Sequence, residues 1–355
     1  GNGFLYTLAP FVTVALNGAV TKVYDGTTAA TLAPANYSVS GAVDGDVVTA
    51  NNPAAGLYAN RNAGTNKNVT VSGLAIATAT NGAATVYGYQ LSSTTANANI
   101  GTITAAPLTL TAAANTKTYD ATTGAAATPT ATGLVSGDTV SGLSEAYANK
   151  NAGSGKTLSV ASYTVNDGNG GNNYAISLVD NTTGVINQAA LTGAITAANK
   201  TYDGTNAATI NSRTLTGVIG GDTVSYVGGT ATFSDKNAAL GKTVTAVGLG
   251  LGGSDAGNYT VNTTATTVAD IAALGITGAI TAANKTYDGT NAATINSRTL
   301  TGVIGGDITN RTTSYGMPPK DTLQLAYSVL TENQKKRFET EDELDFSFGI
   351  QNLAR

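Results

Sequence analysis

Hydrophobic and polar residues alternate in short runs along most of this chain of 355 residues. Clear examples are Val69 with Val71, Leu108 with Leu110, and the series Val247, Leu249 and Leu251. A period of two places successive side chains on opposite faces of a strand, so each run predicts a half-buried β-strand. Turn-forming pairs lie between the runs, at Asp44-Gly45, Asn81-Gly82, Gly137-Asp138 and Asp167-Gly168.

A six-residue motif, Lys-x-Tyr-Asp-Gly/Ala-Thr, occurs four times, at 22–27, 117–122, 200–205 and 285–290. Its tyrosines are 95, 83 and 85 residues apart. Regular self-similarity at this spacing indicates tandem structural repeats. The Tyr-Asp pairs of the motif are Tyr24 and Asp25, Tyr119 and Asp120, Tyr202 and Asp203, and Tyr287 and Asp288.

Three further landmarks recur in step with this motif. A Gly-Asp pair follows each motif tyrosine by 19 to 22 residues, with its carboxylate at Asp46, Asp138, Asp222 and Asp307. A basic-Asn-Ala element comes next in three units, beginning at Arg61, Lys150 and Lys236. A tyrosine preceded by Gly or Asn then closes these units, at Tyr89, Tyr174 and Tyr259. Residues 192–222 and 277–307 are identical, which indicates a recent duplication.

The pattern predicts an all-β fold with about seven short strands in each unit of about 85 residues and no helix. We expect tandem immunoglobulin-like, antiparallel β-sandwich repeats, and a β-grasp sheet is the alternative if a helix is present. Because each repeat contacts only its neighbours, the array should be elongated. The expected segments are the end of a preceding repeat at 1–9, repeats at 10–105, 106–189 and 190–272, a partial repeat at 273–307 and a charged tail at 308–355.

Composition narrows the possible functions. Cysteine and histidine are absent, which removes disulfides, thiolate zinc sites and the commonest general base. Only 11 % of residues are charged and the net charge is −4, which argues against nucleic-acid binding. No run of about 18 apolar residues predicts a membrane span. The apolar start, FLYTLAPFVTVAL, lacks the basic region of a signal peptide.

The opening motif, the Gly-Asp pair, the Lys-Asn-Ala-Gly element and the closing Gly-Asn-Tyr resemble the YDG and related mostly-β glycine-rich (MBG) repeats. Those repeats occur in long bacterial surface proteins such as filamentous-haemagglutinin-like adhesins. The resemblance covers about residues 1–307 and implies export, a stalk of stacked domains, and a role in adhesion or in a biofilm matrix. Ala121 replaces the motif glycine in the second unit, and the fourth unit stops at Asp307.

The last 48 residues differ in composition and hold the only methionine, Met317. Asp321 could cap a helix that begins there, followed by the acidic run ETEDELD. The partial repeat at 273–307 cannot bury its own hydrophobic face. We therefore expect either this tail or a strand from a neighbouring chain to complete it.

Two interpretations of the Tyr-Asp pairs compete. The tyrosines could stack on sugars while the aspartates accept hydroxyl hydrogen bonds, or the pairs could be framework, with a packed ring and a turn carboxylate. A calcium site at the Gly-Asp turns is not supported, because the sequence has no loop with closely spaced carboxylates. A pair of catalytic carboxylates, as in glycosidases, is not supported either, because acidic residues are few and Glu145 is the only glutamate before the tail. We expect no catalytic residue, no metal site and no cofactor.

The leading functional expectation is a structural stalk of a secreted or cell-surface bacterial adhesin or biofilm matrix protein, not an enzyme. The partners would be neighbouring repeats of the same protein. One alternative is weak binding of polysaccharide or host glycan by every repeat, strengthened by avidity. Another is a self-assembling extracellular filament in which strands pair between copies.

Overall fold

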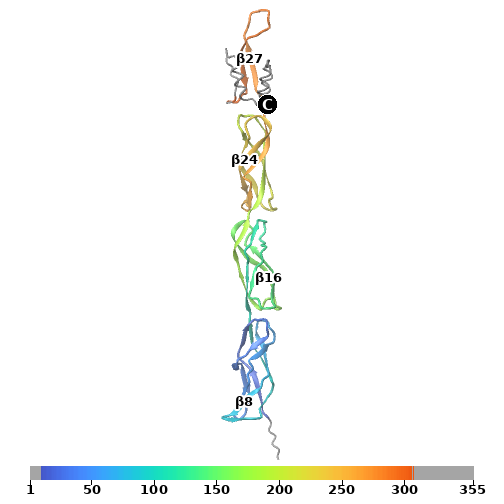
Figure 1. Cartoon of the computed structure of the whole chain (residues 1–355), viewed down its shortest axis with the longest axis vertical. Helices are drawn as coiled ribbons and strands as arrows, with labels where there is room; N and C mark the ends of the chain where they lie inside the picture. The colour runs from blue at the N-terminus through green and yellow to red at the C-terminus, as the bar shows by residue number, and fades with distance from the viewer. Residues whose placement is uncertain (1–8, 306, 308–355) are drawn as a thin grey trace, which may run out of the picture. The chain divides into compact units, whose positions relative to one another are not determined.

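A computed structural model describes residues 9–305 and 307 of the chain. The chain divides into two compact units, Gly1–Asn187 and Gln188–Arg355. Figure 1 marks one strand in each repeat: β8, β16, β24 and β27. The described residues contain no α-helix, only the 3-10 turns η1 (Pro34–Asn36) and η2 (Ala256–Asn258). No helix in this part of the chain is long and apolar enough to cross a membrane.

The first repeat has three sheets, ordered β10-β1-β4, β2-β11-β7-β6-β3 and β5-β8-β9. Its strands are β1 (Phe11–Leu16), β2 (Val20–Val23), β3 (Ala29–Thr31), β4 (Tyr37–Ser40), β5 (Val47–Ala50), β6 (Ala55–Tyr58), β7 (Gly64–Ser72), β8 (Ile76–Asn81), β9 (Ala84–Thr85), β10 (Gln90–Leu91) and β11 (Thr95–Thr104). The third sheet has no counterpart in the next two repeats and forms a small hydrophobic cluster around Val12, Val48 and Ala79.

The second repeat has seven strands in two sheets, ordered β14-β12-β17 and β13-β18-β16-β15. These strands are β12 (Ala106–Thr111), β13 (Thr116–Thr118), β14 (Thr130–Thr132), β15 (Thr139–Tyr147), β16 (Gly153–Asn166), β17 (Tyr174–Val179) and β18 (Asn181–Asn187). The expected number of strands is therefore found in this repeat.

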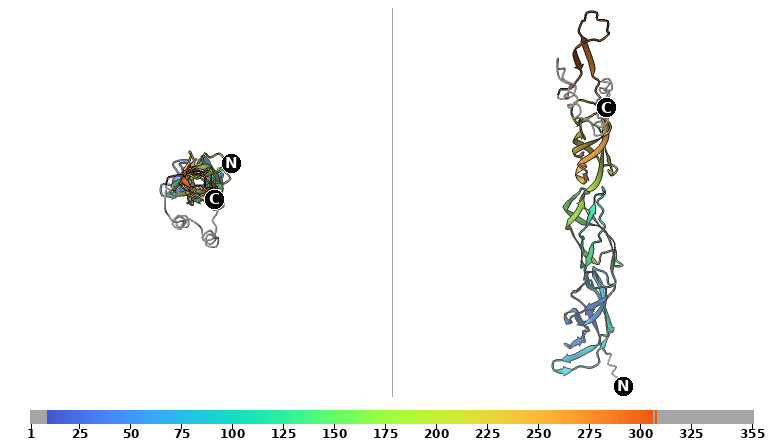
Figure 2. Two further views of the ribbon diagram at one scale, coloured as in Figure 1. Left: turned by 90° about the horizontal axis from the view of Figure 1, so that it is seen from above. Right: turned by 45° about the horizontal axis from the view of Figure 1, so that its top comes forward.

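The third repeat has the orders β22-β19-β25 and β20-β26-β24-β23-β21. Its strands are β19 (Ala189–Ala197), β20 (Lys200–Thr201), β21 (Ala207–Ala208), β22 (Ile210–Thr216), β23 (Ser225–Phe233), β24 (Ala239–Gly252), β25 (Tyr259–Val261) and β26 (Thr264–Ala272). The hairpin β27 (Thr277–Ala282) and β28 (Ile295–Thr301) follows. Figure 2 shows it at the red end of the colour scale, as a two-stranded sheet.

The sheets are mixed, so the expectation of purely antiparallel sheets is wrong. The first strand of each repeat pairs in parallel with a late strand: β1 with β10, β12 with β17, and β19 with β25. The chain then enters the second sheet, where β2, β13 and β20 again pair in parallel with the last strand of the repeat. A period of two identifies a strand but carries no information about the direction of its partner.

Side chains from both sheets of a repeat form a common hydrophobic core. Val69, Val71, Leu108 and Leu110 are all buried, as their alternation predicts, and they belong to one cluster that extends through repeats 1 and 2. A second cluster fills repeat 3 around Phe233, Val244 and Ile271. The fold is therefore mostly β, built from small sheets in tandem.

Val247 is an exception to the predicted alternation, since it is 52 % exposed whereas Leu249 is buried. Before this point the buried residues of β24 are Lys242, Val244 and Ala246, and after it the buried residue is Leu249, at an odd position. Gly248 has a positive φ of 74° at the change, which only glycine adopts without strain. The strand thus turns its other face to the core. The predicted helical tail lies outside the described residues.

Candidate functional site

The repeated Lys-x-Tyr-Asp-Gly-Thr motif forms a closed loop held by its own side chains. In the first copy, Lys22 Nζ donates to Asp25 Oδ1 at 2.7 Å and to the carbonyl of Thr27 at 2.8 Å. The same carboxylate oxygen accepts the N–H and the hydroxyl of Thr27, each at 2.9 Å. The other three copies repeat these bonds. The motif aspartates are therefore committed to the loop.

The charge pairing within the loop has an electrostatic consequence. The hydrogen bond from Lys117, joined by the N–H and hydroxyl of Thr122, lowers the pKa of Asp120 to about 2 although partial burial opposes ionisation. The pKa of Asp203 falls to about 2 for the same reason, with Lys200 as the main cause. These two loops therefore keep their ion pairs well into the acid range, and the pKa values of Asp25 and Asp288 are lowered as well.

The four motif tyrosines differ in exposure. Tyr24 and Tyr119 are only 2 % and 3 % exposed, so their rings offer no face to a ligand in solution. Tyr202 is half-buried and Tyr287 is 93 % exposed. The basic-Asn-Ala lysines lie over two of these rings, with Lys150 Nζ and Lys236 Nζ each 5.9 Å from the ring centroid.

Asp138, the Gly-Asp carboxylate of repeat 2, receives hydroxyls from two repeats. Tyr24 of repeat 1 donates to Asp138 Oδ2 at 2.8 Å, and Tyr174 of repeat 2 donates to the same oxygen at 2.7 Å. The two rings meet edge to face at 5.5 Å. Burial, followed by the bond to Asp138, raises the pKa of Tyr174 to about 12 and also raises that of Tyr24. Both phenols thus remain neutral donors.

The basic-Asn-Ala element of repeat 1 reaches across the same junction. Arg61 Nη2 lies 3.6 Å from Asp138 Oδ1 and donates to the carbonyl of Asp167 at 3.0 Å. The N–H of Ala63 donates to Asn173 Oδ1 at 2.8 Å. Tyr24 and the basic-Asn-Ala element of repeat 1 therefore contact the Gly-Asp pair and the closing turn of repeat 2.

The closing turn of repeat 2 is built around a buried carboxylate. Asp167 is 1 % exposed and accepts the backbone N–H groups of Asn169, Gly171 and Asn173 at 2.8 to 3.1 Å. Burial works against the charge, but these three donors outweigh it and lower the pKa of Asp167. The conformation of this turn is therefore set by hydrogen bonds within repeat 2 and does not depend on the contact with Arg61.

Repeat 3 uses the same arrangement toward the partial repeat that follows it. Tyr202 donates to Asp307 Oδ1 at 2.5 Å, and Lys236 Nζ lies 3.2 Å from the same atom. The bond from Tyr202, with help from Lys236, lowers the pKa of Asp307. The motif glycine allows close approach in both junctions, since a Cβ at Gly204 would lie 3.1 Å from Ile304.

The acceptor half of the junction is formed inside a repeat. Tyr89 donates to Asp46 Oδ2 at 2.7 Å in repeat 1, and Tyr259 donates to Asp222 Oδ2 at 2.6 Å in repeat 3. In each repeat the backbone N–H three residues upstream of the carboxylate donates to the tyrosine oxygen, as Val43 does to Tyr89. In repeat 2, where Tyr174 makes the same bond to Asp138, the closing tyrosine thus preorganises the carboxylate that Tyr24 of repeat 1 contacts.

Sequence reasoning assigned the Gly-Asp carboxylates to turns or calcium and missed their role as the common acceptor. The signal for it was present, because a landmark that keeps its spacing to other landmarks is constrained by contact with them. Glu145, the only glutamate before the tail, is 2 % exposed, and its Oε2 accepts the N–H of Ala113 at 2.6 Å. Among residues 9–305 and 307, no three acidic side chains gather as a metal site would require.

These mixed-sheet repeats, in which a recurring tyrosine donates to a Gly-Asp carboxylate where repeat 1 meets repeat 2 and where repeat 3 meets the partial repeat, define a β-repeat protein. The sequence model of the YDG domain matches residues 10–102, 104–183 and 187–267, and the chain therefore belongs to the YDG domain family. A search of the curated proteins and a search of the solved structures found no match.

Proposed function

We propose that these repeats are a structural stalk segment of a secreted or cell-surface bacterial protein, an adhesin or a component of a biofilm matrix. One observation supports this most directly: recurring residues hold repeat 1 to repeat 2, and their equivalents hold repeat 3 to the partial repeat that follows it. In a ligand-binding repeat they would face solvent instead. Asp138 alone receives Tyr24, Tyr174 and Arg61.

The mechanism of such a stalk is geometric and needs no catalysis. Each repeat would be an immunoglobulin-like sandwich of two packed sheets, distinguished by its parallel first strand, with a third small sheet added in repeat 1. A fixed angle at each junction keeps distance between an anchor and a binding tip. A buried, hydrogen-bonded contact fixes that angle better than a flexible linker, because breaking it leaves polar groups without partners.

A distance measurement across the first junction tests this role. Because the chain has no cysteine, the exposed positions Ser40 and Thr182 can be changed to cysteine and spin-labelled without background. We expect a narrow distance distribution in the full chain and a clearly broader one after Asp138→Ala. The matched control, Asp255→Ala in repeat 3, should leave this distribution narrow. A broad distribution in the unmodified chain would remove the stalk proposal.

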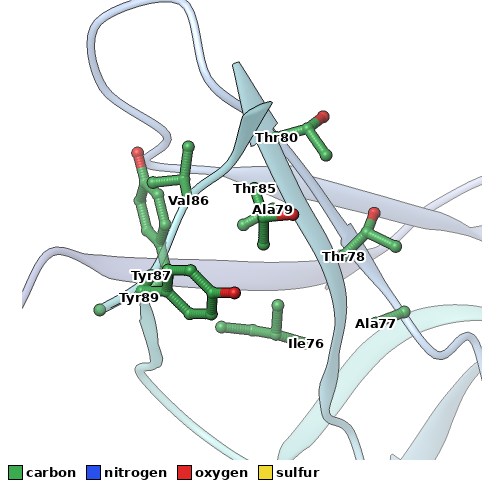
Figure 3. Close-up of a pocket in the computed structure, with 10 residues that line it drawn as sticks. Ile76, Ala77, Thr78, Ala79, Thr80, Thr85, Val86, Tyr87 and Tyr89 are labelled. Carbon is green, nitrogen blue, oxygen red and sulfur yellow. The ribbon is translucent and has the colours of Figure 1, made fainter. Parts of the chain in front are cut away.

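A second candidate function is glycan binding, and it is favoured by a groove in the extra sheet of repeat 1. A cavity of about 370 Å³ lies beside β8 and is lined by Tyr87, Tyr89 and threonines that include Thr78 and Thr80. Figure 3 shows these rings and hydroxyls around the strand. Tyr87 is 88 % exposed, and no charged residue lines the cavity, which suits a neutral polyhydroxyl ligand.

A glycan panel separates the two candidates. If repeat 1 binds sugar in this groove, Tyr87→Ala should abolish the binding, whereas Tyr163→Ala, a change at an exposed tyrosine of repeat 2, should not. If the full chain binds no glycan on the panel and none of the producer's exopolysaccharide, only the stalk role remains.

A further inference from the structure

The hairpin β27–β28 and the hairpin β19–β22 have the same sequence in two different environments. Residues 192–222 and 277–307 are identical. Both hairpins have the same register, with Thr192 opposite Thr216 and Thr277 opposite Thr301, and both contain an irregularity one residue before the end of the first strand. Because the sequences are identical, any difference in burial between the two hairpins is caused by the residues that pack against each of them.

The inward face of the first copy is covered by residues 223–272, whereas the same face of the second copy is exposed in the part of the chain that the structure describes. Ile195 is 6 % exposed and its equivalent Ile280 is 65 % exposed. We call the open surface the half-repeat face. It consists of Gly278, Ile280, Ala282, Ile295 and Leu300, all exposed.

The first copy shows which groups cover this face. The ring of Tyr226 lies directly over Gly193, where an added Cβ would be 2.3 Å from Cζ of the ring. The side chain of Asn262 accepts the N–H of Gly193 at 2.7 Å and donates to its carbonyl at 3.0 Å. Arg213 donates twice to the carbonyl of Gly228, at 2.7 and 2.9 Å. Residues 223–272 thus provide a matched complement of apolar and hydrogen-bonding groups.

The complement within repeat 3 cannot cover the half-repeat face of the same chain. In repeat 3, Leu191 at the start of the covered hairpin pairs with Val261, and Lys200 pairs with Ile271. To cover the second hairpin in the same way, Val261 would have to lie beside Ile276, although Val261 is ten residues upstream of Ile271. Ten residues of strand span roughly 33 Å. The link from Ala272 to Ile276, the equivalent of Leu191, is four residues and reaches at most about 14 Å.

A domain swap, in which segment 223–272 of a second copy of the chain covers the half-repeat face, would give no net burial of surface either. The segment 223–272 of a second copy already covers its own residues 192–222, so a swap would expose the same surface that it buries. The occupant must bring a complement of its own.

We propose that the half-repeat face is a strand-complementation site for another polypeptide. This polypeptide carries an uncovered segment with the pattern of residues 223–272. It supplies an aromatic ring over Gly278, an amide side chain for the backbone of that glycine, and a carbonyl for Arg298. The proposal does not depend on the stalk role, since it concerns only this hairpin.

The test uses the full chain and, as the probe, residues 223–272 fused to a soluble carrier. We expect the probe to bind one site and to slow tryptic cleavage after Arg298. Gly278→Ala should weaken the binding at least about tenfold, because the added methyl group occupies the space of the ring. That change should not affect the free chain, where the nearest atom to the new Cβ is Leu300 Cδ2 at 3.6 Å.

A matched control is available one residue further along the strand. Ala279 is equivalent to Ala194, which faces solvent in the covered copy, so Ala279→Asp should leave the binding unchanged. Ile280→Asp, on the inward face, should abolish it.

Several outcomes would overturn the proposal. They are no binding by the full chain, equal binding by the Gly278→Ala variant, and probe-induced cleavage after Arg213, which would indicate displacement of residues 192–222. Binding only after removal of residues 308–355 would also overturn it, because the tail of the chain would then be the occupant.

Discussion

Asp138 illustrates how one side chain can define a junction. It is 7 % exposed and accepts a hydroxyl from each of the two repeats that meet there. A buried carboxylate is tolerated only where donors replace its lost hydration. Tyr24, Tyr174 and Arg61 do so here, and they come from both repeats. The acceptor is therefore fully satisfied only when the repeats are joined.

In the second repeat, Ala121 replaces the glycine of the motif, and its backbone is strained. Ala121 has φ +62°, close to the +78° of Gly26 and Gly204. A left-handed conformation costs a residue with a Cβ roughly 1–2 kcal/mol, partly offset by the greater freedom of glycine when unfolded. Ala121→Gly should therefore stabilise repeat 2 by about 0.5–1 kcal/mol in urea denaturation.

The reverse change at the equivalent position provides the control. Gly204→Ala should destabilise the chain, because it adds the same strain and places a Cβ 3.1 Å from Ile304. A destabilising Ala121→Gly would mean that the motif loop does not require this conformation.

The ion pair of the motif loop predicts a specific titration. With the pKa of Asp120 lowered to about 2 by Lys117, the carboxylate contributes stability at pH values above its ordinary range. This contribution is lost as the pH falls through about 2. NMR titration of the Asp120 carboxyl should give a pKa near 2, and Lys117→Met should move it back toward its usual value. Equal values in both proteins would contradict the loop geometry.

At the scale of elements, the two identical hairpins separate local from tertiary contributions. Both form with one register and one threonine–serine cross-strand bond, Thr196 to Ser212 and Thr281 to Ser297. Local sequence therefore suffices to set the hairpin. A lone two-stranded hairpin is only marginally stable in water, however, so packing decides how often it opens.

Limited proteolysis measures that difference directly. Trypsin should cleave after Arg298 about tenfold or more faster than after Arg213, although the flanking residues are identical, because β22 is held by the core of repeat 3. Mass spectrometry distinguishes the two cuts by the fragments that they release. Equal cleavage rates would indicate that β28 is packed as well as β22.

At the scale of the whole molecule, repeats 1 and 2 share one hydrophobic cluster, which includes Tyr24, Leu108 and Tyr174. Nearest-neighbour coupling of this kind joins repeats into one cooperative unit. Hydrogen exchange should therefore give equal opening free energies for amides of β7 and β16, within about 1 kcal/mol.

Asp138→Ala provides the contrast for this measurement. Removal of the shared acceptor leaves the buried hydroxyls of Tyr24 and Tyr174 without an acceptor, at a cost of roughly 1–3 kcal/mol each. The opening free energies of the two strands should then diverge. If they already differ in the unmodified protein, the common cluster does not couple the repeats.

The sequence by itself determined the number and spacing of repeats, the strand character of each run and the turns between them. These properties follow from local pattern: Val69 and Val71 are buried because a period of two allows one face to be buried. Family membership followed from the same landmarks. Local pattern also determined the hairpin, because the copies that begin at Thr192 and Thr277 have the same register.

Only the tertiary structure decided the direction of strand pairing, the face that Val247 turns outward, and the contact between Tyr24 and Asp138. Each depends on groups far apart in the chain, and Tyr24 and Asp138 are separated by 114 residues. Ile195 is buried and Ile280 is exposed although they occupy identical positions in identical sequences, so burial depends on what packs against each of them. Pattern specifies which face can be buried, and packing determines whether it is.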